Sequence, residues 1–221
     1  MEGCFVKKWA FVSDFDGTIS KQDFYIVMMD KYFPEGRELY KNWKAGEIKD
    51  IDFLATIFNS INQEEEKIIE DTLSIPIDEY VPDFIKKVQA SGADFYILSA
   101  GTDYYIYHLL KKYGVENVKV FSNEGHYREK NVHMNIDKNQ WHYSERYGID
   151  KSKVIQKLKE EYAMIYFIGD SEPDSHPAQY ADVTFAKNGL QNLLREKKVP
   201  FIPVETFKEV ENYLLEKGVL S

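Results

Sequence analysis

The chain is poor in two features on which whole classes of protein depend, cysteine and long hydrophobic runs. Cys4 is the single cysteine in 221 residues, which excludes an intrachain disulfide and a cysteine-based metal cluster. This composition favours a reducing compartment, so we expect a cytoplasmic protein. No apolar run is long enough to span a bilayer, and residues 1–10 carry two lysines without an apolar core. We therefore expect neither a signal peptide nor a membrane span.

Positive charge is also in short supply. The chain has 28 lysines and arginines against 37 aspartates and glutamates, a formal net charge of −9. Nucleic acids and anionic membranes attract proteins through a positive field, so neither is expected as the main partner. A small phosphorylated metabolite is still compatible, because a bound cation and one lysine can reverse the potential inside a cleft. The sequence leaves open whether the chain is a monomer or a homodimer.

Hydrophobic residues make up 43% of the chain, enough for the core of one α/β domain with a modest insertion. Residues 20–78 show helical periodicity, with helices expected at 23–33 and 47–60 and a third opened by a capping box of Asn62 and Glu65. Strands and helices alternate elsewhere. The predicted fold class is therefore α/β: a Rossmann-like parallel sheet over residues 1–19 and 79–221, with a small helical cap over 20–78.

Outside the helical insertion, the alternation of predicted strands and helices is interrupted only between residues 123 and 147. A polar hairpin and a loop are expected there, and the segment contains His126, His133 and His142. Their spacing matches no usual zinc pattern, so scattered surface histidines are the preferred interpretation. The other expected elements are helices at 81–90, 103–113, 150–162, 188–196 and 205–217, and strands at 94–99, 118–121, 164–168, 182–185 and near 201.

The first strand ends in two aspartates. Residues 9–18, WAFVSDFDGT, run from apolar residues into Asp14 and Asp16, and Gly17 allows a sharp turn before Thr18. Side chains two residues apart on a strand point the same way. Two carboxylates concentrated in this way supply the oxygen ligands that a hard cation such as Mg²⁺ requires.

Three further polar positions follow at strand or helix ends: Ser99, Lys151, and Asp170 together with Asp174. Ligands of open α/β sheets bind beyond the carboxyl ends of the strands, where these groups would converge. The chemistry that fits them is phosphoryl transfer through an aspartyl phosphate, because a carboxylate nucleophile needs a cation and nearby donors to approach a phosphate.

The four motifs, Asp14-Phe15-Asp16-Gly17-Thr18, Ser99, Lys151 and the GDxxxD of residues 169–174, resemble those of the haloacid dehalogenase superfamily. The helical insertion is similar to that of its phosphoserine phosphatase-like branch. The resemblance implies Asp14 as nucleophile and Asp16 as acid/base. It further implies Lys151 as a catalytic and phosphate-binding residue beside Ser99, Ala100 and Gly101. Mg²⁺ would be held by Asp14, Asp16, through its backbone carbonyl, and Asp170. Asp174 is the fourth residue assigned to the metal site, where it would orient Lys151 or a metal-bound water. Lys153 competes with Lys151 for the third motif.

Within that branch, residues 12–23, 95–110 and 166–174 most resemble the phosphatases of methionine salvage. Phosphoserine, phosphoethanolamine, phosphocholine and a broad range of small phosphates remain alternative substrates. Asp23 falls where phosphoserine phosphatases keep a substrate-binding glutamate, so we expect it to contact substrate. Tyr25, Met28 and Met29 either face the cleft, where they would suit a methylthio group, or pack the cap core. A catalytically silent domain that binds a phosphorylated ligand or a partner protein is the rival from another class.

Overall fold

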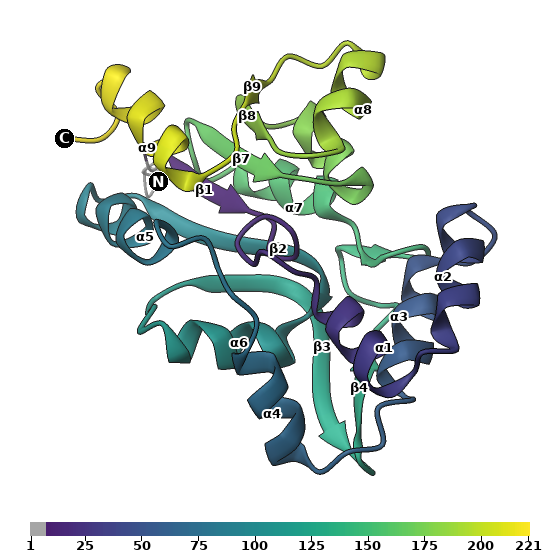
Figure 1. Ribbon diagram of the computed structural model, residues 1–221. Coiled ribbons are helices and arrows are strands. Elements are labelled where there is room, and N and C mark those ends of the chain that lie inside the picture. Colours follow the sequence, from purple (N-terminus) through teal and green to yellow (C-terminus); the bar gives the residue numbers. More distant parts are fainter. Residues whose placement is uncertain (1–7) are drawn as a thin grey trace.

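A computed structural model describes residues 8–221, so Cys4 lies outside the described residues. Its main sheet has seven strands in the order β4-β3-β2-β1-β7-β8-β9, and only β3 and β4 pair antiparallel (Figure 1). The strands are β1 (Ala10–Ser13), β2 (Asp94–Thr102), β3 (Lys119–Arg128), β4 (Asn131–Asn135), β7 (Ile165–Gly169), β8 (Val183–Ala186) and β9 (Ile202–Pro203). The predicted fold class is confirmed.

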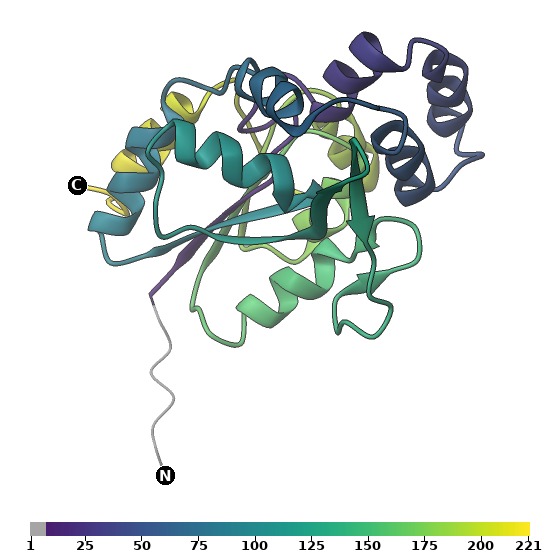
Figure 2. The same cartoon turned by 90° about the horizontal axis from the view of Figure 1, so that it is seen from below.

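Helices cover both faces of this sheet (Figure 2). One face carries α5 (Val81–Ala90), α6 (Asp103–Lys112) and α9 (Phe207–Glu216). The other carries α7 (Lys151–Leu158) and α8 (Leu190–Lys197). Alternation along β1 explains the two layers, because Phe11 packs on Phe84 of α5 at a ring distance of 4.9 Å, whereas Val12 joins the core on the opposite face. Among residues 8–221, no helix combines the length and apolar character needed to cross a membrane.

The central strand β1 lies between β2 and β7. Ser13, its last residue, is level with Ile97 of β2 and Ile168 of β7. The chain proceeds from β1 to one side of the sheet and later returns to the other side, which makes the end of β1 a topological switch point. Side chains beyond these three strands therefore share one crevice.

The insertion after β1 contains α1 (Phe24–Tyr32), α2 (Gly36–Lys44), α3 (Asp50–Phe58) and α4 (Glu65–Leu73). The first three helices pack together beside the carboxyl edge of the sheet, whereas α4 lies along α6 (Figure 1). The expected bundle is thus a three-helix group plus a fourth helix that rests on the core. Helix α2 was not expected from the sequence. Met28 and Met29 are buried in this packing, as the core interpretation predicted.

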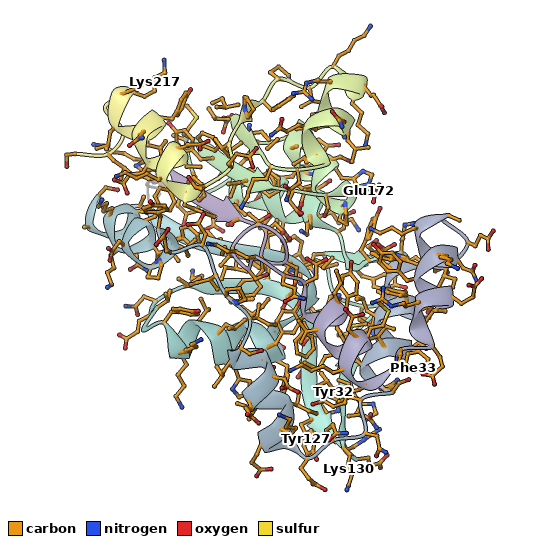
Figure 3. The ribbon with its side chains drawn as sticks, viewed as in Figure 1. Tyr32, Phe33, Tyr127, Lys130, Glu172 and Lys217 are labelled. Atoms are coloured by element: carbon orange, nitrogen blue, oxygen red, sulfur yellow. The ribbon has the colours of Figure 1, made fainter. Side chains whose placement is uncertain are left out.

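The capping box expected at Asn62 is wrong. Asn62 has a left-handed backbone, with φ 49°, and its N–H donates to Asn131 Oδ1 at 2.9 Å. Helix α4 begins after Glu64, whose carboxylate lies 2.5 Å from Lys130 Nζ. Figure 3 shows Lys130 and Tyr127 at the far end of the β3–β4 hairpin. Contacts with this hairpin, rather than a local cap, hold the segment before α4.

Candidate active site

The turn after β1 brings the first motif against the fourth. The backbone N–H of Asp14 donates to the carbonyl of Ile168 at 2.9 Å, which fixes the end of β1 to β7. Gly17 has φ 78°, and a Cβ at this position would lie 2.4 Å from Asp170 Oδ2. Two features of the turn therefore require glycine at position 17: the positive φ angle and the space that the Asp170 carboxylate occupies.

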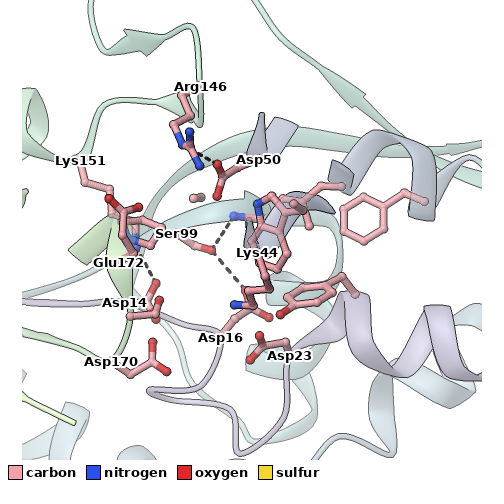
Figure 4. A pocket seen from close by; sticks show the side chains of 18 of the residues that line it. Asp14, Asp16, Asp23, Lys44, Asp50, Ser99, Arg146, Lys151, Asp170 and Glu172 are labelled. Atoms are coloured by element: carbon pink, nitrogen blue, oxygen red, sulfur yellow. Dashed lines mark hydrogen bonds and ion pairs between the residues drawn. The ribbon is translucent and has the colours of Figure 1, made fainter. Parts of the chain in front are cut away.

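Lys151, the first residue of α7, lies between two carboxylates, and Figure 4 shows its contact with one of them, Asp14. Its Nζ donates to Asp14 Oδ1 at 2.6 Å and to Asp174 Oδ1 at 2.7 Å. Burial alone would lower the pKa of Lys151, but the two carboxylates raise it above its ordinary value, so this lysine remains a cation. Lys153 is exposed, and its Nζ donates instead to the carbonyl of Tyr143 at 3.2 Å. Of the two candidate lysines, Lys151 is the one in the site.

Asp174 is fully buried, and hydrogen bonds occupy both of its oxygens. Oδ1 accepts from Lys151, and Oδ2 accepts the backbone N–H groups of Asp170 at 3.0 Å and Ser171 at 3.2 Å. This carboxylate therefore fixes the direction of Lys151 and the shape of the loop that follows β7. Of the two roles that the sequence left open, its contacts favour the orientation of Lys151.

Two carboxylate oxygens in the same place have no hydrogen-bond partner among the described residues, Asp14 Oδ2 and Asp170 Oδ1, although both are buried. Oxygens of Asp14, Asp170 and Asp174 lie within 4.8 Å of one another. Burial, reinforced by the charge of Asp174, raises the pKa of Asp170 to about 7. Unpaired buried carboxylates are costly, and a hard cation with oxygen ligands removes that cost. The donor set therefore fits Mg²⁺.

The carboxylate of Asp16 is not part of this group. Its Oδ1 accepts the N–H of Phe24 at 3.1 Å, and its Oδ2 accepts the hydroxyl of Tyr105 and, at 3.4 Å, that of Ser99. Burial is the largest cause, and the negative charge of Asp23 the next, of a pKa raised to about 7. Near neutral pH, Asp16 can therefore give up or take up a proton at little cost.

The end of β2 forms the next wall. Ser99 Oγ accepts the N–H of Gly101 at 3.0 Å, which turns the strand end toward Asp16. The Asn123 amide donates to the carbonyls of Ala100 at 2.9 Å and Tyr147 at 3.0 Å. This residue, which the sequence analysis missed, joins the Ser99 strand end to the ribbon formed by β5 (Tyr143–Ser144) and β6 (Gly148–Ile149).

These groups open into a cavity of about 240 Å³. Every predicted site residue except Asp174 lines it, including Asp23, whose pKa is raised by burial. Tyr25 is also in the wall, whereas Met28 and Met29 are not, so the idea that these methionines face the cleft is wrong. Several other lining residues were not expected from the sequence, among them Trp43, Lys44, Asp50, Tyr105 and Arg146.

Comparison with known proteins places this geometry in a family. The family model of haloacid dehalogenase-like hydrolases matches residues 11–176. A 2-hydroxy-3-keto-5-methylthiopentenyl-1-phosphate phosphatase of Bacillus cereus (strain G9842) is 27% identical over 205 residues, covering 91% of this chain and 93% of that protein. The protein of the same name from Bacillus pumilus (strain SAFR-032) is 28% identical over 218 residues, covering 93% and 90%.

Solved structures agree on the fold. A phosphoserine phosphatase with a phospho-aspartyl intermediate analogue superimposes with a TM-score of 0.69 at 18% identity, covering 94% of this chain and 99% of that one. Cytosolic 5'-nucleotidase IIIB bound to cytidine gives a TM-score of 0.65 at 16% identity, covering 95% and 84%. The chain therefore belongs to the haloacid dehalogenase-like hydrolases, and it is a phosphatase of that family.

Proposed function

We propose that this phosphatase is a Mg²⁺-dependent phosphomonoesterase that forms an aspartyl phosphate on Asp14 and hydrolyses 2-hydroxy-3-keto-5-methylthiopentenyl 1-phosphate. The observation that carries the proposal is the state of the Asp14 carboxylate. Lys151 holds one of its oxygens at 2.6 Å, while the other is buried and has no hydrogen-bond partner among the described residues. An oriented, unpartnered carboxylate oxygen in a cavity is what a nucleophile for phosphorus requires.

In the first step, an oxygen of Asp14 bonds to phosphorus and the bond from phosphorus to the ester oxygen breaks. Asp16 gives its proton to that departing oxygen and is left as a carboxylate, which the hydroxyls of Tyr105 and Ser99 and the N–H of Phe24 stabilise. Lys151 holds the attacking carboxylate and adds positive charge next to the oxygens of the transferring group.

In the second step, the Asp16 carboxylate takes a proton from water as the water oxygen bonds to phosphorus. The bond between Asp14 and phosphorus breaks, inorganic phosphate leaves, and Asp14 returns to a carboxylate beside Lys151. One residue thus serves as acid and then as base.

The unpartnered oxygen of Asp170, which is buried, is the group that a cation would satisfy. Asp14, Asp170 and the backbone carbonyl of Asp16 would hold Mg²⁺, which when bound would screen the repulsion between the carboxylate and the phosphate. Asp174 would contribute by holding Lys151 and the loop after β7.

The substrate proposal rests on the names of the relatives and on the cavity wall. Tyr25, Trp43, Leu54 and Phe58 line the cavity and offer apolar surface to a methylthio tail. Phosphoserine is the second candidate, because Asp23 gives the wall a carboxylate that could hold an ammonium group. With either substrate, the proposed enzyme is cytoplasmic and acts on a small phosphorylated metabolite.

The test is phosphate release from a panel of phosphomonoesters with and without Mg²⁺. The panel contains the methylthio enol phosphate, phosphoserine, phosphoethanolamine and phosphocholine. We expect a kcat/KM of about 10⁴ M⁻¹s⁻¹ or more for the first compound only, and only with Mg²⁺. Higher efficiency with phosphoserine would reject the substrate, and full activity in the presence of a chelator would reject the metal.

A further inference from the structure

The segment before α7 reaches the cavity through one side chain, Arg146. It lies in the turn between β5 and β6, on the core side of the cavity, and Figure 4 shows it facing Asp50 across from Asp14 and Asp16. Its Nε lies 2.9 Å from Oδ2 of Asp50, a residue of α3 in the proposed cap. Core and cap therefore meet in an ion pair that lines the cavity.

The two atoms of this ion pair are close, but they do not have the geometry of a hydrogen bond. Neither Arg146 Nε nor Asp50 Oδ2 has a hydrogen-bond partner of good geometry among residues 8–221, although both atoms are buried. The Asp50 side chain is 9% exposed and that of Arg146 is 43% exposed, and both residues line the cavity. Because Nε is buried against Asp50, a ligand oxygen in the cavity would reach the guanidinium through its two terminal N–H₂ groups.

Arg146 is nevertheless held in place. Its guanidinium lies 5.6 Å from the ring centroid of Tyr147, whose hydroxyl donates to Glu172 at 2.6 Å in the loop after β7. Its backbone carbonyl accepts the N–H of Ile51 at 3.1 Å. Contacts from both sides of the cavity thus fix the fork of N–H groups, which lowers the entropy cost of binding.

We infer that Arg146 is a specificity-determining residue that donates hydrogen bonds to oxygen atoms on the carbons next to the phosphoester, and that Asp50 is the positioning residue that holds it. The inference rests on the proposed function, because that substrate carries a hydroxyl and a keto oxygen on adjacent carbons. A planar guanidinium presents its N–H groups in a fixed fork that matches two neighbouring oxygens, whereas the ammonium of a lysine acts as a point charge without that fixed geometry. The aromatic and aliphatic residues of the cavity wall would then contact the methylthio tail of the substrate.

The experiment measures kcat, KM and competitive inhibition for three phosphates: the methylthio enol phosphate, dihydroxyacetone phosphate, which has adjacent keto and hydroxyl oxygens but no tail, and phenyl phosphate, which has neither. Arg146→Met should lower kcat/KM for the enol phosphate by a factor of about 10 to 100, the cost of losing a hydrogen bond to a charged group. The loss with phenyl phosphate should be at least about tenfold smaller. Arg146→Lys should not restore the difference, and Asp50→Asn should act mainly through KM.

The chain offers a matched control. Lys49 Nζ and Glu145 Oε1 form a second cap–core ion pair at 2.6 Å, next to the first in sequence, but neither residue lines the cavity. Lys49→Gln and Glu145→Gln should leave all three phosphates unaffected. Equal losses with all phosphates in the Arg146 variants, or the same losses in the control variants, would overturn the inference. If the enol phosphate is not a substrate, an Arg146-dependent preference for dihydroxyacetone phosphate over phenyl phosphate still supports it, and no such preference refutes it.

Discussion

Replacement of Tyr105 by phenylalanine isolates one hydroxyl of the site. Tyr105 is 2% exposed and donates to Asp16 Oδ2. Its ring stacks on Phe24 at a centroid distance of 4.3 Å and an interplanar angle of 16°. Phenylalanine keeps this stacking and removes only the donor, so the change tests the hydrogen bond and not the packing.

The size of the effect follows from the charge on the acceptor. A hydrogen bond to a charged group contributes about 1.5 to 3 kcal/mol. If Tyr105 orients Asp16 during proton transfer, kcat/KM should fall by a factor of about 10 to 150. Stability should change little, because Asp16 still accepts from Phe24 and Ser99. A loss of about 1 kcal/mol would lower the melting temperature by roughly 2–4 °C.

Tyr104→Phe is the matched control. This neighbouring hydroxyl donates to Glu65 of α4 at 3.3 Å and does not line the cavity. Steady-state kinetics and thermal unfolding of both variants decide the question. Activity of Tyr105→Phe within twofold of the parent, or an equal loss in Tyr104→Phe, would refute the role given to Tyr105.

The remaining predictions concern the cation site and the cap. Gly17→Ala should abolish Mg²⁺-dependent activity, because its Cβ would lie 2.4 Å from Asp170 Oδ2, and the positive φ adds about 1–2 kcal/mol of strain; retained turnover would contradict this. Mg²⁺ at 100 times its Kd should stabilise the fold by about 2.7 kcal/mol, and a melting-temperature rise that survives Asp170→Asn would contradict the ligand assignment. Burial alone would raise the pKa of Asp71, but hydrogen bonds from Lys31 and Tyr32 lower it below its ordinary value. Its stabilisation is therefore present above pH of about 4 and is lost as the pH falls through the lower folded pKa. Asp71→Asn should cost about 1–3 kcal/mol in urea unfolding at pH 7 and progressively less as the pH falls below about 4, and a cost that does not fall with pH would exclude this linkage.

The sequence was sufficient to predict the groups that lie at strand ends. Parallel strands bring their carboxyl ends to one edge, so Asp14, Ser99 and Asp170 had to approach one another once the strands were recognised. Lys151 follows from the same logic, since it begins the helix that leads into β7. These inferences need only the period and order of the elements.

Groups whose place depends on helix rotation or loop docking could not be predicted. Helix α6 carries three tyrosines in four positions: Tyr104 faces α4, Tyr105 reaches Asp16, and Tyr107 is 51% exposed. Their residue types are identical, so only the packing of α6 distinguishes them. Arg146 is a similar case, because its segment has no helical or strand period and meets the cap only through tertiary contacts.

Asn62 is the reverse case, because its local sequence predicted a helix cap that the structure does not form. An asparagine three residues before a glutamate fits a capping box. Asn131 and Lys130 of the β3–β4 hairpin instead bind the backbone of Asn62 and Gln63 at 2.9 Å and 2.8 Å. Two long-range hydrogen bonds to the hairpin outweighed one local cap.

Mass spectrometry of the enzyme quenched with acid during turnover would show directly which residue carries the phosphoryl group. We predict one phosphoryl group on the peptide that contains Asp14 in the wild-type protein, and neither this adduct nor turnover in Asp14→Asn. A phosphoryl group on another residue, or turnover retained in Asp14→Asn, would contradict Asp14 as the nucleophile.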